Sequence, residues 1–212
     1  MHNHFHSNPD LRPAGERFFV RSEAGEDVPL RRIRLSDTPE CFGGGRNPDF
    51  FMTDVTGGYG AADAGETGEL VRRERPEPGS PTQLAAARAG VVTPEMAYAA
   101  ARENANLEGF AASLSEPGLE RVRDRLMPLL ERVEPWTGER VRARVAARQA
   151  VIPAAFTHPE VEPTVIGRHF ATKVNANVGT SASSSDWREE GRKMQEALAR
   201  GADTVMDLST GR

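Results

Sequence analysis

The chain has 212 residues, a formal net charge of −4 and 38% hydrophobic side chains, enough for one or two domains with a sizeable core. The slightly acidic balance gives no electrostatic footprint for nucleic acid or anionic lipid, and no apolar run approaches the roughly 20 residues of a membrane span, so we expect a cytoplasmic protein. The single cysteine, Cys41, excludes an intrachain disulfide and an iron–sulfur cluster held by this chain's own thiolates, and it suits a reducing compartment.

The first third of the chain predicts little packed structure. We expect residues 1–27 to form a flexible tail. We favour a polar terminus over a metal tract for its three alternating histidines, His2, His4 and His6. Residues 28–35 can form a strand, with one side made by Leu30, Arg32 and Arg34. Residues 36–81 are rich in Gly and Pro, which predicts loops with at most one short strand.

Helices are expected between residues 80 and 148. Ser80 and Thr93 each precede a proline, which predicts two N-caps, and Thr137 is expected to cap a later helix. Pro128 is expected to kink or divide the helix that contains it. The expected helices cover residues 80–90, 93–106, 119–133 and 137–148.

The last third predicts one strand–helix–strand unit. Side chains alternate in character over residues 170–178, which indicates a strand. Asp186 is expected to cap a helix that Gly201 ends, with an apolar stripe made of Trp187, Gly191, Met194 and Leu198. Residues 202–208 predict a second strand, so the unit is a right-handed βαβ unit with parallel strands.

Polar residues gather where the first of these strands ends. Ligands of parallel sheets and barrels lie beyond the carboxyl ends of the strands, where Asn175 and Asn177 precede a loop rich in Gly, Ser and Thr. The Asn177 amide suits the edge of a heterocycle, and the loop with the following helix N-terminus suits an anion. A capped turn with solvated amides fits the spacing equally well, and no nucleotide-binding fingerprint is present.

Other residues that could carry chemistry have simpler interpretations. Met206, near the end of the second strand, is in a position that core filler usually occupies. Asp207 needs a hydrogen bond, a salt bridge or a ligand inside a sheet. Two histidines without metal-ligand spacing are interpreted as structural, namely His158 and His169. Asp54 and Tyr59 could contribute to a functional site, but a Gly-rich surface turn is the simpler interpretation of their segment.

Several stretches carry a family resemblance. The strongest are TQLAAARAGVVTPEMAYAAARENA, RVRARVAARQAVIPAAFTHPEVEPTVIGRHFATKVNANVGTSA and GADTVMDLSTGR, with weaker echoes in VPLRRIRLSDTP and TDVTGGYG. Together they span most of residues 28–212 and resemble the phosphomethylpyrimidine synthase (ThiC) family, which makes the pyrimidine half of thiamine.

The resemblance implies a radical S-adenosylmethionine enzyme with a 4Fe-4S cluster and zinc. Such an enzyme rearranges 5-aminoimidazole ribotide into hydroxymethylpyrimidine phosphate, releasing formate and carbon monoxide. The implied fold class is α/β, with an N-terminal α/β domain over residues 28–165 and the first βαβ unit of an incomplete (β/α)8 barrel over residues 166–212. The family forms homodimers in which one subunit's cluster segment closes over the other's barrel.

Two family ligand positions map onto this chain. Asn177 matches the barrel-strand Asn that contacts the ribotide, and Met206 matches the Met that packs on it, which replaces the interpretation of Met206 as core filler. The family's other substrate contacts, zinc-binding histidines and cluster cysteines would lie beyond Arg212. The chain departs from the family pattern at three positions where Asn is usual, namely Ala155, Thr157 and Thr180.

The resemblance leaves three interpretations of function open. In the first, the chain stops two strands into the barrel of a phosphomethylpyrimidine synthase, so we expect this segment alone to be inactive and those strands to be poorly supported. In the second, it belongs to a paralogue that makes a hydroxybenzimidazole from the same ribotide. In the third, it is a non-catalytic remnant or a ribotide-binding module.

Overall fold

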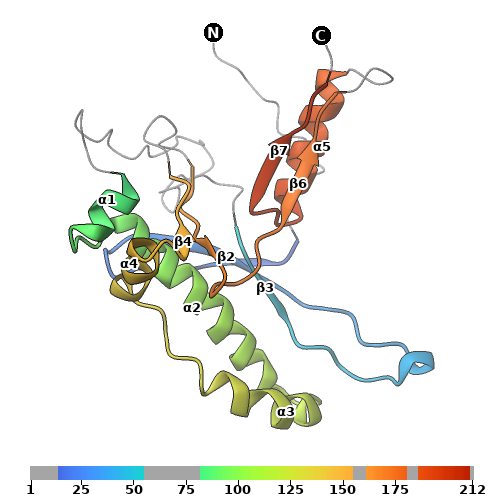
Figure 1. The fold of residues 1–212 in the computed structure, drawn as a ribbon. Coiled ribbons are helices and arrows are strands. Elements are labelled where there is room, and N and C mark those ends of the chain that lie inside the picture. Colours follow the sequence, from blue (N-terminus) through green and yellow to red (C-terminus); the bar gives the residue numbers. More distant parts are fainter. Residues whose placement is uncertain (1–13, 55–81, 155–160, 181–185, 211–212) are drawn as a thin grey trace. The chain divides into compact units, whose positions relative to one another are not determined.

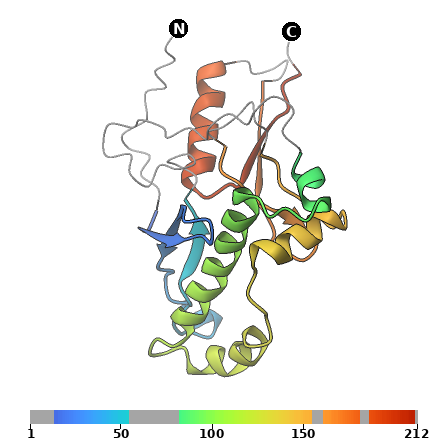
Figure 2. The same cartoon turned by 90° about the vertical axis from the view of Figure 1, so that its left-hand side faces the viewer.

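The computed structural model describes residues 14–54, 82–154, 161–180 and 186–210, which divide into two compact units (Figures 1 and 2). The N-terminal unit comprises Gly15–Ala171, and the C-terminal unit contains Thr172–Arg212. The expected boundary between residues 165 and 166 lies a few residues before the observed division. Helices and strands occur together, as expected for an α/β protein. Within the described ranges, no helix has the length and apolar character that a membrane crossing requires.

The N-terminal unit opens with an antiparallel sheet of three strands. In sheet order they are β1 (Glu16–Arg21), β2 (Asp27–Ile33) and β3 (Phe50–Thr53). Val28 and Leu30 of β2 are completely buried and cluster with Tyr98 of the long helix α2 (Pro94–Leu114), which lies along the sheet (Figure 1). The expectation of a flexible tail over residues 1–27 is wrong for β1, because Phe18 packs against the same cluster.

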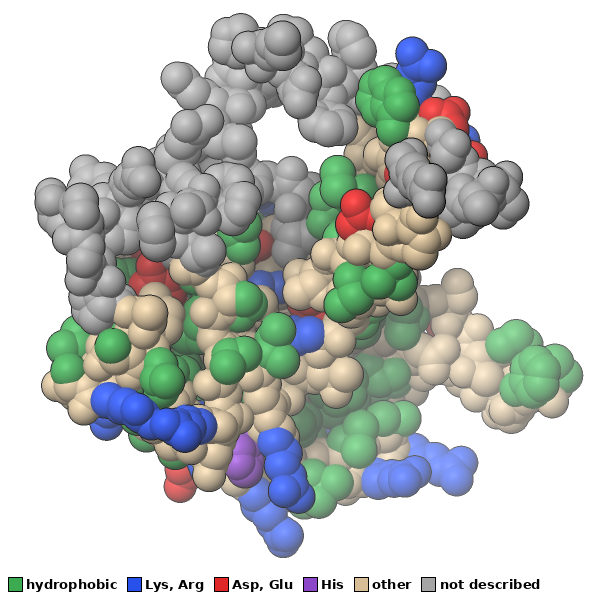
Figure 3. Space-filling model, turned by 45° about the horizontal axis from the view of Figure 1, so that its top comes forward, with side chains coloured by type: hydrophobic (Ala, Val, Ile, Leu, Met, Phe, Trp, Pro, Cys, Tyr) green, Lys and Arg blue, Asp and Glu red, His purple; other side chains and the backbone are tan. Residues whose placement is uncertain are grey.

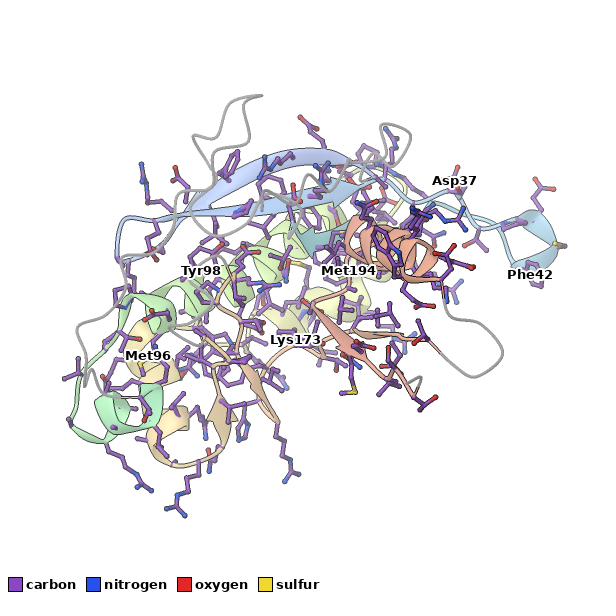
Figure 4. All side chains as sticks on the ribbon, turned by 90° about the horizontal axis from the view of Figure 1, so that it is seen from above. Asp37, Phe42, Met96, Tyr98, Lys173 and Met194 are labelled. Carbon is purple, nitrogen blue, oxygen red and sulfur yellow. The ribbon has the colours of Figure 1, made fainter. Side chains whose placement is uncertain are left out.

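A projecting arm joins β2 to β3. The chain turns there at a short 3-10 helix, η1 (Glu40–Phe42), and Thr38 N donates to Gly45 O at 2.8 Å across the arm. Phe42 lies at the outer end of the arm with 80% of its surface exposed (Figure 4). The described part of residues 36–81 thus contains loops and one short strand, β3, as predicted, and residues 55–81 lie outside the described residues.

The first helix, α1 (Gln83–Arg88), is capped by Thr82. Thr82 Oγ1 accepts a hydrogen bond from Ala85 N at 3.2 Å. The predicted cap, Ser80, lies outside the described residues. The helix is followed by Gly90, whose φ of 81° confirms the predicted stop.

The long helix α2 (Pro94–Leu114) confirms the second predicted cap. Thr93 Oγ1 accepts from Met96 N at 3.3 Å, and Pro94 occupies the first turn. The helix continues about two turns beyond the predicted end at Asn106. Packing accounts for the extension, because α2 contacts all three strands of the sheet and Leu114 is completely buried.

Two further helices follow. The helix α3 (Glu120–Leu130) contains Pro128 and ends two residues later, so the proline lies in its last turn and does not divide it. The next helix, α4 (Gly138–Ala146), confirms the predicted cap, because Thr137 Oγ1 accepts from Arg140 N at 3.1 Å.

A hydrophobic core joins α1, α2 and α4 to a two-stranded antiparallel sheet, made by β4 (Ala150–Val151) and β5 (Ile166–Gly167). Trp136 and Phe170 stack in this core with their ring centroids 4.1 Å apart. The predicted strand over residues 170–178 is therefore wrong at its start. Phe170 is buried in the N-terminal unit, and Ala171 N donates to Glu103 Oε2 at 2.8 Å.

The C-terminal unit contains the predicted strand–helix–strand unit, with β6 (Asn175–Val178), α5 (Trp187–Ala199) and β7 (Thr204–Asp207). Asp186 caps α5 as predicted, because its Oδ1 accepts from Arg188 N at 2.9 Å. Gly201 follows the helix with a φ of 88°, as predicted. The two strands are parallel, which confirms the predicted βαβ connection.

Candidate functional site

The parallel strands β6 and β7 place the two predicted ligand residues next to each other. In the register of the sheet, Asn177 pairs with Met206, and Asn175 pairs with Thr204. Because side chains alternate along a strand, these four residues share one face of the sheet, here called the Asn177–Met206 face. Asn177 is exposed and Met206 has 50% of its surface exposed, so this face is open to a ligand.

Hydrogen bonds orient the amide side chains on this face. Asn175 Nδ2 donates to Asn177 Oδ1 at 2.9 Å, and Thr204 Oγ1 donates to Asn175 Oδ1 at 2.8 Å. Thr204 is not among the candidate residues that the sequence predicts. The Thr204 hydroxyl lies beside Asn175 because of the register in which the two strands pair. The residue pattern of each strand by itself does not reveal that register.

The opposite face of the sheet carries smaller apolar residues. Ala176 and Val178 point away from the Asn177–Met206 face and are partly buried, and α5 packs against β6. Met194 of α5 lies on the helix that covers this strand (Figure 4). The helix therefore occupies one side of the sheet and leaves the amide-bearing side accessible.

Backbone donors at the carboxyl ends of the strands are already used within the protein. Gly179 N donates to Glu190 Oε2 at 2.8 Å, and Thr180 N donates to Ser209 Oγ at 3.1 Å. A Cβ on Gly179 would lie 2.6 Å from Ser209 N, so the close approach of the two strand ends requires glycine. These two N–H groups do not form the predicted anion site, and residues 181–185 of the loop lie outside the described residues.

Two carboxylates lie at the same end of the unit. Asp207 Oδ1 accepts from Ser209 Oγ at 2.6 Å and from Ser209 N at 2.8 Å, which lowers the pKa of Asp207. Lys193, and then the Gly179 N–H group, lower the pKa of Glu190. Asp207 is therefore held by hydrogen bonds, one of the interpretations left open by its sequence position. Lys193 offsets the charge of Glu190, and Asp207 lies on the same face as its register partner Val178, opposite the Asn177–Met206 face.

Two of the other predicted site residues, Asp54 and His169, belong to the N-terminal unit. Asp54 is buried in the N-terminal unit, where Arg17 Nε and Arg31 Nε lie 2.8 Å and 3.0 Å from its Oδ2. Its interpretation as part of a surface turn is wrong. His169 is exposed and lies near Arg144, with 3.5 Å between ring and guanidinium nitrogens. Several named residues fall outside the described ranges, namely His2, His4, His6, Tyr59, Ala155, Thr157 and His158.

A buried polar cluster in the N-terminal unit is not predicted from the sequence. Tyr98 Oη donates to Glu162 Oε1, and Arg102 Nε donates to Thr53 Oγ1 at 2.7 Å. Arg102 also donates to Pro163 O at 3.3 Å. Burial of the carboxyl group raises the pKa of Glu162 to about 7, against the opposing effect of Arg102. Tyr98 and Arg102, one helical turn apart, gave a weak signal for this cluster.

The donor set does not fit a metal cluster. Cys41, the only cysteine of the chain, is exposed on η1 and cannot supply the several thiolates that an iron–sulfur cluster takes. Across the described ranges, no group of three or more His, Cys, Asp or Glu side chains could hold a metal ion. Basic side chains lie in separate groups on the face shown in Figure 3, in keeping with the low net charge.

Comparison with protein families agrees with the resemblance in the sequence. The model of the radical SAM ThiC family matches residues 82–212, which include α1, α2 and the whole of the β6–α5–β7 unit. Proteins of this family are radical S-adenosylmethionine enzymes of thiamine biosynthesis, and full-length members use S-adenosylmethionine and a 4Fe-4S cluster. Because the match covers well over half of its length, the chain belongs to the radical SAM ThiC family.

Proposed function

We propose that the chain carries the first part of the substrate site of a phosphomethylpyrimidine synthase, with 5-aminoimidazole ribotide as the substrate. The observation that supports this proposal best is the pairing of Asn177 with Met206 on one open face. An amide can hydrogen-bond the edge of the aminoimidazole ring, and a thioether can pack on its flat side.

The hydrogen bonds at the strand ends indicate which part of the ribotide binds here. The N–H groups of Gly179 and Thr180 already donate to the side chains of Glu190 and Ser209. A phosphate group would therefore find no free donor at these two positions. We therefore assign the Asn177–Met206 face to the base of the ribotide, with the phosphate bound by other residues.

Binding and conversion are separate in this proposal. The chain has one cysteine, so it does not supply the thiolates of the cluster on which the radical chemistry of the family depends. We expect the 212-residue chain to bind the ribotide weakly and not to convert it. In a full-length homodimer, the same face would form part of a complete barrel mouth.

A nuclear magnetic resonance titration tests the proposal and locates the ligand. The chain has six methionines, and their methyl groups can be labelled and observed separately. Addition of 5-aminoimidazole ribotide is expected to shift the Met206 methyl signal and the Asn177 side-chain amide signal. Met52 and Met96 serve as internal controls, because both are buried in the N-terminal unit.

Ribose 5-phosphate, which lacks the base, is the matched ligand control and is expected to leave Met206 unshifted. If the ribotide shifts no signal at millimolar concentrations, or shifts only signals of residues in the N-terminal unit, the proposed site is wrong. The absence of any shift would favour a remnant without ribotide affinity.

The product of a full-length enzyme is a separate question. Thr180, which stands where Asn is usual in the family, follows the end of β6 and carries a hydroxyl in place of an amide. With the replacements at Ala155 and Thr157, it keeps the second candidate open, a paralogue that makes a hydroxybenzimidazole from the same ribotide. Product analysis on a full-length version distinguishes the two enzymes, because one product is a pyrimidine phosphate and the other is not.

A further inference from the structure

A chain of three hydrogen-bonded side chains crosses the Asn177–Met206 face. The Thr204 hydroxyl donates to Asn175 Oδ1 at 2.8 Å, and Asn175 Nδ2 donates to Asn177 Oδ1 at 2.9 Å. The chain begins on β7 and runs to β6, so it exists only when the two strands are paired. It ends at the residue that the proposed function places against the ligand.

The direction of these hydrogen bonds sets the orientation of both amides. A side-chain amide has a carbonyl oxygen that accepts and an NH₂ group that donates. Because the Thr204 hydroxyl engages Asn175 Oδ1, the Asn175 NH₂ group is turned toward Asn177. That NH₂ group in turn holds Asn177 Oδ1, so the Asn177 NH₂ group is directed away from Asn175.

The Asn177 NH₂ group is the donor that remains for a ligand. Asn177 Nδ2 makes no hydrogen bond within the described part of the chain, and the residue is exposed. Asn175, in contrast, already uses its carbonyl oxygen and its NH₂ group within the protein. Asn175 is thus placed to orient its neighbour, while Asn177 is placed to bind.

We infer that Asn175 and Thr204 are positioning residues, which hold the Asn177 carboxamide so that its NH₂ group donates to an acceptor atom of the ligand. This inference deepens the proposed function and rests on it for the identity of the ligand. In aminoimidazole ribotide, the acceptor in the ring plane is the ring nitrogen that is not bonded to the ribose. The exocyclic amine is a donor and does not match the Asn177 NH₂ group.

Two pairs of variants test the positioning role. Thr204→Val removes the hydroxyl and keeps the β-branched shape, whereas Thr204→Ser keeps the hydroxyl. Asn175→Ala removes the amide that holds Asn177. We expect Thr204→Val and Asn175→Ala to weaken ribotide binding about fivefold to tenfold, as for loss of one hydrogen bond. Thr204→Ser is expected to bind as the unmodified chain does.

A ligand analogue separates positioning from a general loss of structure. In an aminopyrrole ribotide, a C–H group replaces the acceptor nitrogen of the ring. The unmodified chain is expected to prefer the ribotide over this analogue, and Thr204→Val and Asn175→Ala are expected to lose that preference. A merely structural role would weaken binding of both ligands equally, and this result would overturn the inference.

A measurement without ligand keeps the test independent of the proposed function. In the free chain, the Asn175 NH₂ protons are expected to exchange with water more slowly than those of Asn177, and Thr204→Val is expected to remove the difference. Equal exchange in the unmodified chain would overturn the inference even if the ribotide binds. If the expected difference is found but no ribotide shift occurs, the proposed function fails and the positioning of Asn177 stands.

Discussion

Asn177 and Met206 are register partners on the parallel strands β6 and β7, and both are accessible on the same face. They lie far apart in the sequence, and the helix α5 between them returns the chain to the same edge. This relationship gives a physical reason for two residues of very different chemistry to act together. One offers hydrogen bonds in a plane, and the other offers polarizable contact area.

The buried carboxylate of Asp54 is expected to be important for stability. Its Oδ2 lies 2.8 Å from Arg17 Nε and 3.0 Å from Arg31 Nε. Asp54→Asn removes the negative charge between two arginines, and loss of one partner of a buried ion pair costs about 3–5 kcal/mol. Urea denaturation at neutral pH measures the change. Asp124→Asn is the matched control, because Asp124 pairs with Arg123 at the surface and is expected to contribute less than about 1 kcal/mol. Equal effects of the two substitutions would contradict this account of Asp54.

Two helical glycines are expected to respond oppositely to alanine. A Cβ on Gly109 of α2 would lie 2.4 Å from the Phe51 ring, whereas a Cβ on Gly191 of α5 would meet nothing within 4 Å. Gly109→Ala is expected to cost about 1–3 kcal/mol through overpacking. Gly191→Ala is expected to gain up to about 1 kcal/mol from helix propensity. Thermal unfolding of both variants measures the change in stability. A stabilised Gly109→Ala protein would show that α2 does not pack closely against Phe51 at this position.

The buried carboxyl group of Glu162 is expected to make stability depend on pH. Its neighbours are Tyr98 and Arg102 of α2, together with Asp54 and Arg17 from the sheet side. Burial raises its pKa to about 7 from an ordinary value of 4.5, so the folded chain binds this proton more tightly than the unfolded chain. The stabilisation is therefore fully present below about pH 4.5 and is lost as the pH rises through about 7.

The measurement for Glu162 is the free energy of unfolding between about pH 5 and 8, which is expected to fall by on the order of 2 kcal/mol as the pH rises. Glu162→Gln keeps a neutral side chain of the same shape and is expected to flatten this slope. An identical slope in both proteins would exclude Glu162 as its source.

The C-terminal sheet is expected to open more readily than the N-terminal sheet. Among the described residues, the strands β6 and β7 form a two-stranded sheet with one open face, and such sheets are marginally stable. The strand β2 is paired on both sides and contains completely buried side chains. Hydrogen exchange on the purified chain is expected to be faster across β6 than across β2. Slow exchange over residues 174–178 in a monomer would contradict this expectation.

Local signals in the sequence identified the elements whose ends are set by nearby residues. The caps at Thr93, Thr137 and Asp186 were predicted because a short polar side chain before a helix satisfies free N–H groups within one turn. The stop at Gly201 was predicted because only glycine readily adopts its positive φ.

Contacts between distant residues account for what the sequence did not reveal. Phe170 lies in a stretch with the alternating pattern of a strand, but its ring is stacked on Trp136. This position of Phe170 depends on packing in the whole core, which the local pattern does not show. The buried charge of Asp54 became interpretable only when β1 and β2 brought Arg17 and Arg31 beside it. In the candidate site, Asn177 and Met206 were identified through the family resemblance, whereas Thr204 required the strand register.

The dissociation constant of 5-aminoimidazole ribotide for the Asn177→Ala variant shows whether the Asn177–Met206 face binds the substrate. We expect this substitution to weaken binding tenfold or more, roughly the loss of a hydrogen bond and of the amide's contact with the ring. Arg200→Ala is the control, because Arg200 lies in the same unit, follows α5, and pairs with Glu196 at the surface. Equal affinity of the ribotide for the unmodified chain and for Asn177→Ala would contradict the claim that this face binds the substrate.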